Sequence, residues 1–250
     1  MILTDDFVYI HQPKTGGTFV TRVVERLYQD GRRGPLVNTH KHGSCSDIPP
    51  AWRSKPRITT IRNPYDRYVS QYRFAWWKRH PELYCGEAAM RDMFPHYPEL
   101  SFGEFLELAN ARFVGCHQGK DTGFHNASFP EDRRLGWHTE QFVRFYCAEP
   151  REVFAALTED GIAEGRCRRA MFEIRFLTAE RLNVGLHAFL GELGHAPDAI
   201  AFVRGAERIY PDEGGRAAED RWESYYTPEL KRLVRTRERL LFQLFPEYDV

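Results

Sequence analysis

The chain has 250 residues, of which 42% are hydrophobic, enough for one sizeable α/β domain or at most two small ones. Its 35 Lys and Arg residues equal its 35 Asp and Glu residues, which excludes the overall positive charge expected of a nucleic-acid-coating protein. Any anion-binding site must therefore be local.

The chain shows no targeting or membrane signal. Its first residues, MILTDDFVYI, lack a basic segment followed by a long apolar one, and no apolar run approaches ~20 residues. We therefore expect neither a signal peptide nor a membrane span, and a cytoplasmic location. The five cysteines form no C-x-x-C pair, so we expect reduced thiols rather than disulfides or a zinc site. No pattern indicates an oligomeric state.

The first predicted elements are a short buried strand at residues 7–10, a turn with the sequence PKTGGT at residues 13–18, and an amphipathic helix after it. Backbone N–H groups at the start of a helix have no intrahelical partner, and with the helix dipole they favour an anion. The two glycines allow close approach of the backbone, and the lysine and threonines add charge and donors. The turn predicts a phosphate-type ligand; a purely structural strand-to-helix connection is the alternative.

This turn differs from the ordinary P-loop, G-x-x-x-x-G-K-[ST], in which the lysine follows the glycines and stands beside a magnesium-binding hydroxyl. Here Lys14 precedes the glycines. The order indicates a phosphate site of a different kind.

The next segment, NTHKHGSCSDIP, contains two histidines, His40 and His42. An imidazole titrates near neutral pH and can take a proton from a reacting hydroxyl. Either histidine is therefore a candidate general base, although a lone histidine is more often structural.

A second strand-to-helix junction follows in RITTIRNPYDRYVSQYRFAWW, residues 57–77. The pattern predicts a strand at residues 58–61, an N-cap at Asn63 with Pro64 at the first helical position, and one apolar helical face that ends at Trp76. Arg62 stands where the strand ends, at the edge of a parallel sheet where ligands bind, and Ser70 follows about two helical turns later.

Lys14 and Arg62 are 48 residues apart (62 minus 14), and each belongs to a junction with anion-binding groups. Taken singly, Arg62 could be a surface ion-pair partner and Ser70 an ordinary helical residue. Together the two junctions indicate two phosphates of one nucleotide.

The region from residue 73 to residue 141 mixes aromatic side chains with cations, a composition suited to an acidic sugar. We expect an acceptor-binding pocket there and name His138 and Gln141 as its candidates; solvated loop charges are the alternative. Two further helix starts are predicted: a capping box at Ser101 and Glu104, and a terminal helix from Thr227 and Pro228 whose leucines at residues 230–244 form one face.

The two junctions resemble known motifs. PKTGGT after the first strand resembles the 5′-phosphosulfate loop, and IRNPYDRYVS resembles the 3′-phosphate motif, of sulfotransferases that use 3′-phosphoadenosine 5′-phosphosulfate (PAPS). The similarity is closest to the carbohydrate type, including heparan sulfate 2-O-sulfotransferases. It extends over essentially the whole chain, with a divergent middle. Residues 215–222, GRAAEDRW, match poorly the glycine-rich loop of small-molecule sulfotransferases, which also favours the carbohydrate type.

The resemblance implies roles for particular residues. The 5′-phosphosulfate would be held by Lys14, Thr15, Gly16, Gly17 and Thr18, and the 3′-phosphate by Arg62 and Ser70. In the 2-O type a similar His-x-His stretch carries the catalytic base, which places the base at His42, with His40 as its helper or rival.

The implied fold is a single α/β domain over residues 1–250, with a P-loop-like parallel sheet flanked by helices. The implied reaction moves a sulfuryl group in line from PAPS to a hydroxyl of a carbohydrate, glycolipid or other glycoconjugate, leaving 3′-phosphoadenosine 5′-phosphate (PAP). A hydroxyl or amine of a non-sugar acceptor is the alternative. Lys14 would stabilise the charge on the leaving phosphate. We expect no requirement for a metal ion and no nucleic-acid partner.

Two other readings stay open. A P-loop nucleotide kinase or phosphotransferase would use ATP and Mg²⁺, with a lysine after the glycines and a strand-end Asp for the metal; the sequence shows neither. A nucleotide-binding module without catalysis would keep Lys14 and Arg62 and make the histidines idle.

Overall fold

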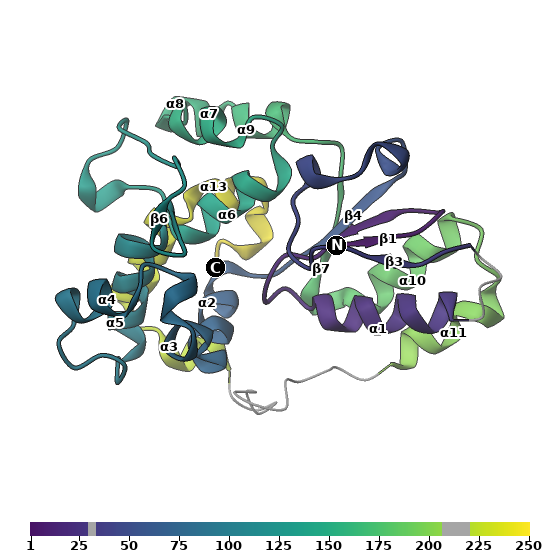
Figure 1. Ribbon diagram of the computed structural model, residues 1–250, viewed down its shortest axis with the longest axis horizontal. Helices are drawn as coiled ribbons and strands as arrows, with labels where there is room; N and C mark the ends of the chain where they lie inside the picture. The colour runs from purple at the N-terminus through teal and green to yellow at the C-terminus, as the bar shows by residue number, and fades with distance from the viewer. Residues whose placement is uncertain (30–33, 207–220) are drawn as a thin grey trace. The chain divides into compact units, whose positions relative to one another are not determined.

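The computed structural model describes residues 1–29, 34–206 and 221–250 (Figure 1). Its contacts divide the chain into two compact units. The sheet unit contains residues 1–62 and 172–210, and the helical unit contains residues 63–171 and 211–250. The mixed α/β architecture with parallel strands and flanking helices is confirmed. Most of the poorly matching segment at residues 215–222 lies outside the described residues.

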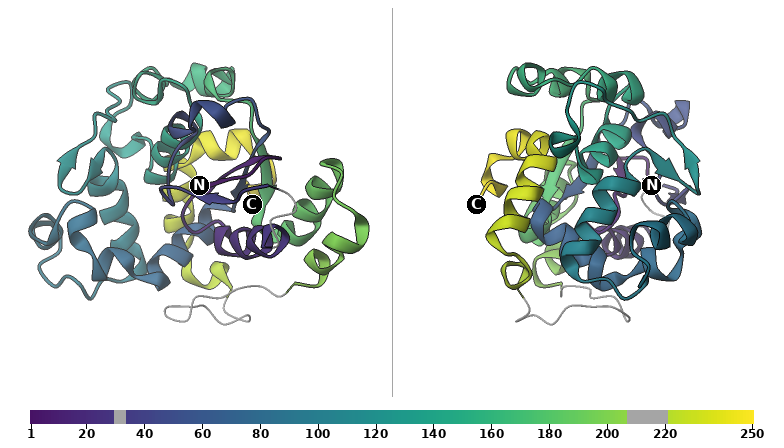
Figure 2. Two further views of the ribbon diagram at one scale, coloured as in Figure 1. Left: turned by 45° about the vertical axis from the view of Figure 1, so that its right-hand side comes forward. Right: turned by 90° about the vertical axis from the view of Figure 1, so that its left-hand side faces the viewer.

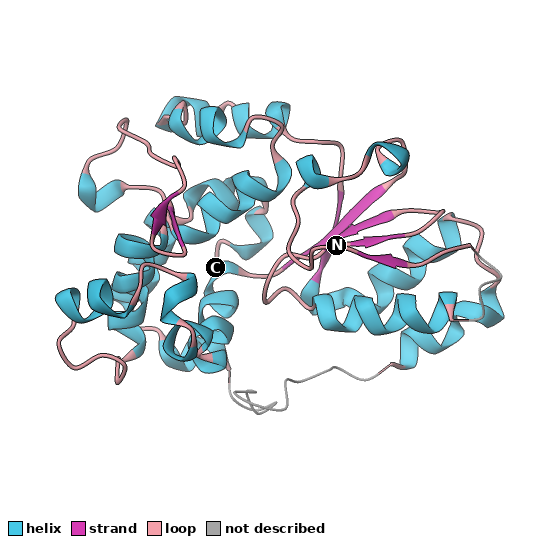
Figure 3. Ribbon diagram, in the orientation of Figure 1, coloured by secondary structure: helices cyan, strands magenta, loops and turns pink. Residues whose placement is uncertain are grey.

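The sheet unit is built on five strands in the order β3-β1-β2-β4-β7 (Figure 3). They are β1 (Ile2–Leu3), β2 (Val8–Ile10), β3 (Val37–Asn38), β4 (Arg57–Ile61) and β7 (Arg175–Thr178). β2, β4 and β7 are parallel, with Tyr9 opposite Ile58 and Thr59 opposite Phe176. β1 and β3 extend the sheet antiparallel and were not predicted, because two-residue strands carry no readable alternation.

Three helices cover one face of this sheet: α1 (Gly17–Tyr28), α10 (Leu182–Glu192) and α11 (Pro197–Gly205). α1 and α11 contact each other and lie side by side in Figures 1 and 2. The buried core of this unit contains side chains from the sheet and from the helices: Phe7, Tyr9 of β2, Ile58 of β4, Val20 of α1 and Leu186 of α10. Burial of these apolar side chains holds α1 against the sheet, so its first turn follows the carboxyl end of β2.

The helical unit consists of short helices and one small hairpin (Figure 3). The helices are α2 (Pro64–Phe74), α3 (Trp76–Arg79), α4 (Glu87–Met93), α5 (Phe102–Leu108), α6 (Trp137–Tyr146), α7 (Pro150–Ala155), α8 (Glu159–Ala163), α9 (Arg166–Ala170), α12 (Pro228–Arg237) and α13 (Arg239–Leu244). The hairpin pairs β5 (Cys116–His117) with β6 (Lys120–Asp121). Among the helices of the described ranges, none is both long and apolar enough to cross a membrane.

The predicted helix starts are confirmed. The Asn63 side chain accepts a hydrogen bond from the Tyr65 N–H, with Pro64 at the first helical position of α2. Ser101 and Glu104 form the reciprocal capping box of α5. The Thr227 side chain accepts from the Leu230 N–H at the start of α12. In each case a side-chain oxygen satisfies a backbone donor that the helix cannot.

Two predicted helices are shorter than expected. Ala75 has a left-handed backbone, φ 51°, that ends α2, so Trp76 begins α3 and does not continue the face of α2. The C-terminal helix is also interrupted, because Glu238 (φ −105°, ψ 21°) separates α12 from α13. Its apolar side chains therefore do not lie on one continuous face. In both places the tertiary position of one residue overrides the helical pattern.

Glu238 is buried because its carboxylate binds the start of α6. It accepts hydrogen bonds from the Tyr68 hydroxyl at 2.5 Å, from the His138 N–H at 3.1 Å and from the Thr139 N–H and hydroxyl, both at 2.7 Å. A carboxylate at a helix N-terminus satisfies orphan donors and complements the helix dipole. This contact explains the interruption at Glu238.

Candidate functional site

The loop between β2 and α1 leaves the start of the helix open to a ligand. Gly16, the N-cap of α1, is exposed and has a left-handed backbone at φ 98°, and no side chain caps the helix. Lys14 also has a positive φ, 63°, and its side chain is partly exposed, while Thr18 is exposed in the first turn. The loop therefore presents uncapped N–H groups, an ammonium and a hydroxyl, the groups that bind an anion.

Gly17 has a different role from Gly16, because the His11 ring occupies the space beside it. A β-carbon at Gly17 would lie 2.1 Å from His11 Nε2, far inside van der Waals contact. Glycine at this position allows the first turn of α1 to approach the ring at the end of β2.

Thr15 is fully buried, and its hydroxyl is used within the protein. It donates to the Gln12 carbonyl at 2.9 Å and lies 2.7 Å from the Thr60 hydroxyl, which is itself 3.1 Å from the Tyr9 hydroxyl. This buried chain of hydroxyls ties the loop to β2 and β4. The Thr15 side chain therefore supports the loop. Its backbone is the part of Thr15 that is suited to a ligand.

Arg62 brings the two predicted anchors together. It follows β4 directly, and its Nη1 donates to the Lys14 carbonyl at 3.3 Å. The guanidinium is partly buried at this place. The strand-end arginine thus lies against the loop that carries the lysine, although 48 residues (62 minus 14) separate them in the chain.

Of the two candidate bases, His42 is the one held against this loop. Its Nδ1 lies 2.9 Å from the His11 carbonyl oxygen, and its ring meets the His11 ring edge-on with centroids 5.2 Å apart. A carbonyl only accepts, so Nδ1 carries the proton and Nε2 of the neutral ring keeps its lone pair. Partial burial lowers the pKa of His42, with a smaller contribution from Lys41, while the hydrogen bond to His11 opposes the shift.

His40 is exposed and contributes its backbone to the same loop. Its carbonyl accepts from the Met1 nitrogen at 2.8 Å and from the Gly43 N–H at 3.0 Å. These bonds shape the turn that carries His42.

Three predicted site residues belong to the helical unit. Ser70 is partly buried on α2. His138 is fully buried, with its ring stacked on Tyr68 at a centroid distance of 3.7 Å and its Nε2 2.6 Å from Gln71 Oε1. Burial, with the nearby Arg67 guanidinium, holds the pKa of His138 well below its usual value. It therefore lies in the interior of the unit as a neutral ring.

Gln141 lies one turn along α6 from His138 and is partly exposed. Its Oε1 accepts a hydrogen bond from Arg67, whose side chain is almost completely buried. An amide held by a buried guanidinium keeps its NH₂ group for another acceptor, the property that a sugar-binding residue needs.

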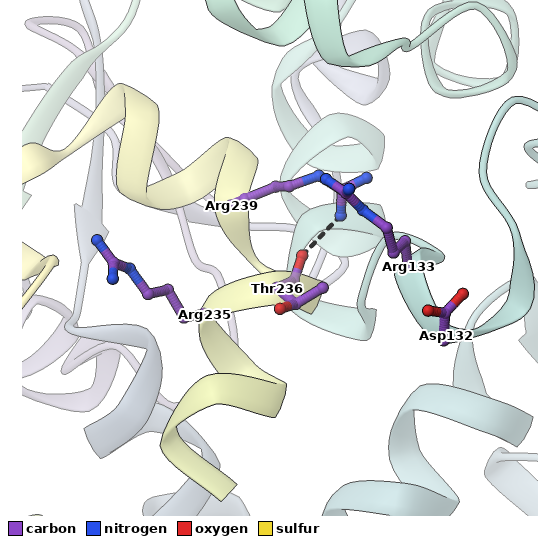
Figure 4. Close-up of a pocket in the computed structure, with 5 residues that line it drawn as sticks. All are labelled: Asp132, Arg133, Arg235, Thr236 and Arg239. Atoms are coloured by element: carbon purple, nitrogen blue, oxygen red, sulfur yellow. Dashed lines mark hydrogen bonds between the residues drawn. The ribbon is translucent and has the colours of Figure 1, made fainter. Parts of the chain in front are cut away.

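A pocket of about 370 Å³ opens elsewhere in the helical unit (Figure 4). It is lined by Asp132, Arg133, Arg235, Thr236 and Arg239. Arg133 and Arg239 lie side by side because both bind the Glu159 carboxylate, and Arg235 binds Asp249. Paired carboxylates balance these arginines, and none of the predicted site residues lines the pocket.

Sequence reasoning missed His11, Arg67 and the hydroxyl chain of Tyr9 and Thr60. One available signal was position: His11 directly follows β2, at the carboxyl end of a parallel strand where ligands bind. Arg67 gave no such signal, since an arginine in a helix is ordinarily read as a solvated side chain.

Two expectations, of no metal site and of reduced cysteines, concern the described part of the chain. No group of three or more His, Cys, Asp or Glu residues within it is placed to hold a metal ion. The sulfur atoms of Cys147 and Cys167 lie 3.8 Å apart in the interior of the helical unit. The absence of a metal requirement stays a prediction.

Comparisons with known proteins identify the family. No curated protein sequence matches the chain. Among solved structures, "Crystal structure of mouse sulfotransferase SULT7A1 complexed with PAP" is similar at 15% identity and a TM-score of 0.41, covering 98% of this chain and 84% of that one. The profile of the sulfotransferase family matches residues 2–150, more than half of the chain and both predicted junctions. The chain belongs to the sulfotransferase family.

Proposed function

We propose that this sulfotransferase uses PAPS as its sulfuryl donor and a hydroxyl of a carbohydrate or glycoconjugate as its acceptor. The observation that carries the proposal is the contact of Arg62 with the carbonyl of Lys14. It unites a strand-end guanidinium and a lysine-bearing helix start, as a nucleotide with phosphates at both its 5′ and 3′ positions requires.

The loop fits the 5′ end of such a nucleotide. Lys14, the exposed Gly16 and the hydroxyl of Thr18 surround a helix start that no side chain caps. The backbone of Thr15 and the glycine at position 17 complete this set. Arg62 and Ser70 are the proposed ligands of the 3′-phosphate. The Lys14 ammonium and the backbone donors of the loop suit the 5′-phosphosulfate, and the Arg62 guanidinium suits the 3′-phosphate.

PAPS supplies an activated sulfuryl group with a phosphate leaving group. The protein must therefore position donor and acceptor, take the proton of the acceptor hydroxyl and neutralise the charge on the leaving phosphate. The acceptor oxygen attacks sulfur as the bond from sulfur to the bridging oxygen breaks. Nε2 of His42 takes the proton of the acceptor hydroxyl, because its lowered pKa keeps the ring neutral at pH 7. The Lys14 ammonium stabilises the negative charge left on the phosphate.

The acceptor class follows from the region at residues 73–141. Trp76 is 37% exposed, stacks on Phe74 with centroids 5.6 Å apart, and has the Arg79 guanidinium 5.3 Å from its ring centre. Exposed aromatic faces with neighbouring cations suit a sugar that bears acidic groups. Gln141 is retained as an acceptor-side residue, whereas His138 is buried, and we propose that it supports α6 instead.

The test is thermal unfolding of the protein with PAP, compared with ADP and with ATP plus Mg²⁺. A ligand at about 100 times its Kd stabilises the folded state by roughly 2.7 kcal/mol, a readily measured rise in Tm. The variant is Arg62→Ala. Its matched control is Arg57→Ala, at the opposite end of the same strand, where the side chain binds the carbonyls of Arg53 and Glu173.

We expect PAP alone to raise the Tm of the wild type and of Arg57→Ala, and to do so weakly or not at all in Arg62→Ala. A shift with ATP and Mg²⁺ but none with PAP would replace the proposal with the kinase reading. Binding of PAP, but no transfer of a sulfuryl group from PAPS to any saccharide acceptor at protein concentrations sufficient for single turnover, would favour the nucleotide-binding module without catalysis.

A further inference from the structure

His11 occupies the position where β2, the ligand loop and the histidine-bearing loop meet. It directly follows β2 and is 7% exposed. Its ring packs against Tyr9, with centroids 5.8 Å apart, and against the backbone of Gly17 at the start of α1. These contacts give the ring a defined place in the sheet unit before any ligand binds.

His11 contacts His42 in two ways. Its carbonyl accepts the Nδ1 proton of His42 at 2.9 Å, and its ring meets the His42 ring at 78° with centroids 5.2 Å apart. The first contact selects one tautomer of His42, and the second restricts rotation of its ring. Within the described residues, the ring nitrogens of His11 make no hydrogen bond that would commit them to another task.

We propose that His11 is a positioning residue for His42: its carbonyl holds the proton on Nδ1, and its ring keeps Nε2 in place to receive the proton of the acceptor. The inference rests on the proposed function, in which His42 is the base. It assigns to the His11 side chain a packing role and no proton transfer.

The electrostatic surroundings agree with this role. Burial lowers the pKa of His11 to about 3, with smaller contributions from His42, Lys41 and the N-terminal amine. His11 therefore stays neutral and does not add a charge beside His42. The groups that face His42 are His11, Lys41, the N-terminal amine and His40. Lys41, the N-terminal amine and His40 each lower the pKa of His42 and so disfavour its protonation.

The kinetic test compares His11→Ala with His11→Phe, which keeps a flat ring, and with His187→Ala, a partly buried histidine of α10 in the same unit. We expect His11→Ala to lower kcat roughly tenfold or more through loss of orientation, at unchanged PAP affinity. The acid limb of its pH–rate profile should move to higher pH, as the freed His42 ring regains water. His11→Phe should keep kcat within about threefold and keep the wild-type limb, because the ring contact remains. His187→Ala should behave as the wild type.

A second readout is independent of turnover. Nitrogen-15 NMR of histidine-labelled protein, with His42→Ala used to assign the signals, should show the Nδ1–H tautomer of His42 in the wild type, in His11→Phe and in His11→Ala, because all three keep the backbone carbonyl that accepts this proton. An Nε2–H tautomer in the wild type would overturn the inference without any variant.

The remaining outcomes distinguish failure of this inference from failure of the proposed function. Wild-type kcat and a wild-type pH profile in His11→Ala would overturn the inference. So would a loss in His11→Phe as large as in His11→Ala, since a titrating nitrogen would then be required. Wild-type turnover in His42→Ala would instead refute His42 as the base, and with it that part of the proposed function, whatever the NMR shows.

Discussion

The candidate site of the sheet unit and the interior of the helical unit use polar side chains in opposite ways. In the sheet unit, Lys14 and Arg62 follow the parallel strands β2 and β4, and His42 lies on a neighbouring loop; all three are partly or fully exposed. In the helical unit, Glu238 and Tyr68 are completely buried and bind each other. A buried polar group must find its partners inside the protein, whereas a group at a strand end can keep donors for a ligand.

This difference separates function from stability. Polar groups of the first kind should be removable with little loss of folding, at a large cost in turnover. Polar groups of the second kind should do the reverse. Each change below tests one side of that contrast.

The largest effect should come from Lys14→Ala. Loss of the ammonium that stabilises the leaving phosphate should lower kcat by about 10²–10³, the usual cost of one charge-stabilising donor. The Tm should change little, because the side chain is partly exposed on a loop. Kinetics and unfolding are compared with Lys55→Ala, a partly exposed lysine just before β4, which should retain turnover. A loss of Tm that accounts for the loss of activity would contradict the contrast.

Glu238→Gln should act on stability instead. An amide cannot match a carboxylate as the acceptor for the Tyr68 hydroxyl and the N–H groups that begin α6, so the free energy of unfolding should fall by about 2–4 kcal/mol. Denaturant unfolding measures it. Glu247→Gln, at an exposed position of the same C-terminal region, is the matched control and should be close to neutral. An equally small effect at Glu238 would show that the buried contact adds nothing net.

The smallest effect is a pH dependence that comes from His11. Its folded pKa is about 3 and its unfolded value is about 6.5, so below pH 6.5 the unfolded chain binds a proton that the folded protein does not. The free energy of unfolding should therefore fall on acidification, by about 1.4 kcal/mol from this residue between pH 7.5 and 5.5.

Urea unfolding of the wild type and of His11→Phe at these two pH values isolates the contribution. His11→Phe should lose less stability on acidification than the wild type by about that 1.4 kcal/mol. Equal losses in the two proteins would mean that His11 is not held neutral by its surroundings.

Local patterns predicted much of the sheet unit. The strand at residues 8–10, the turn and α1 follow from an apolar run, a glycine pair and a 3.6-residue period, each readable within a few residues. In the helical unit, Asn63 and Pro64 predicted the start of α2 for the same reason. The strands β1 and β3 carry too few residues for a pattern, and the end of α2 at Ala75 depends on a left-handed residue that no glycine announces.

The candidate site divides in the same manner. The sequence alone determined which residues can bind an anion or take a proton, because charge, hydroxyl and imidazole chemistry belong to the residue type. It also determined that Lys14 and Arg62 follow strands, since strand and helix patterns are local. Only the tertiary structure decided that Arg62 meets Lys14, that His11 holds His42 and that Glu238 begins α6, because these contacts join residues 31 to 100 positions apart. The free energy of such contacts depends on burial and distance, which no local pattern contains.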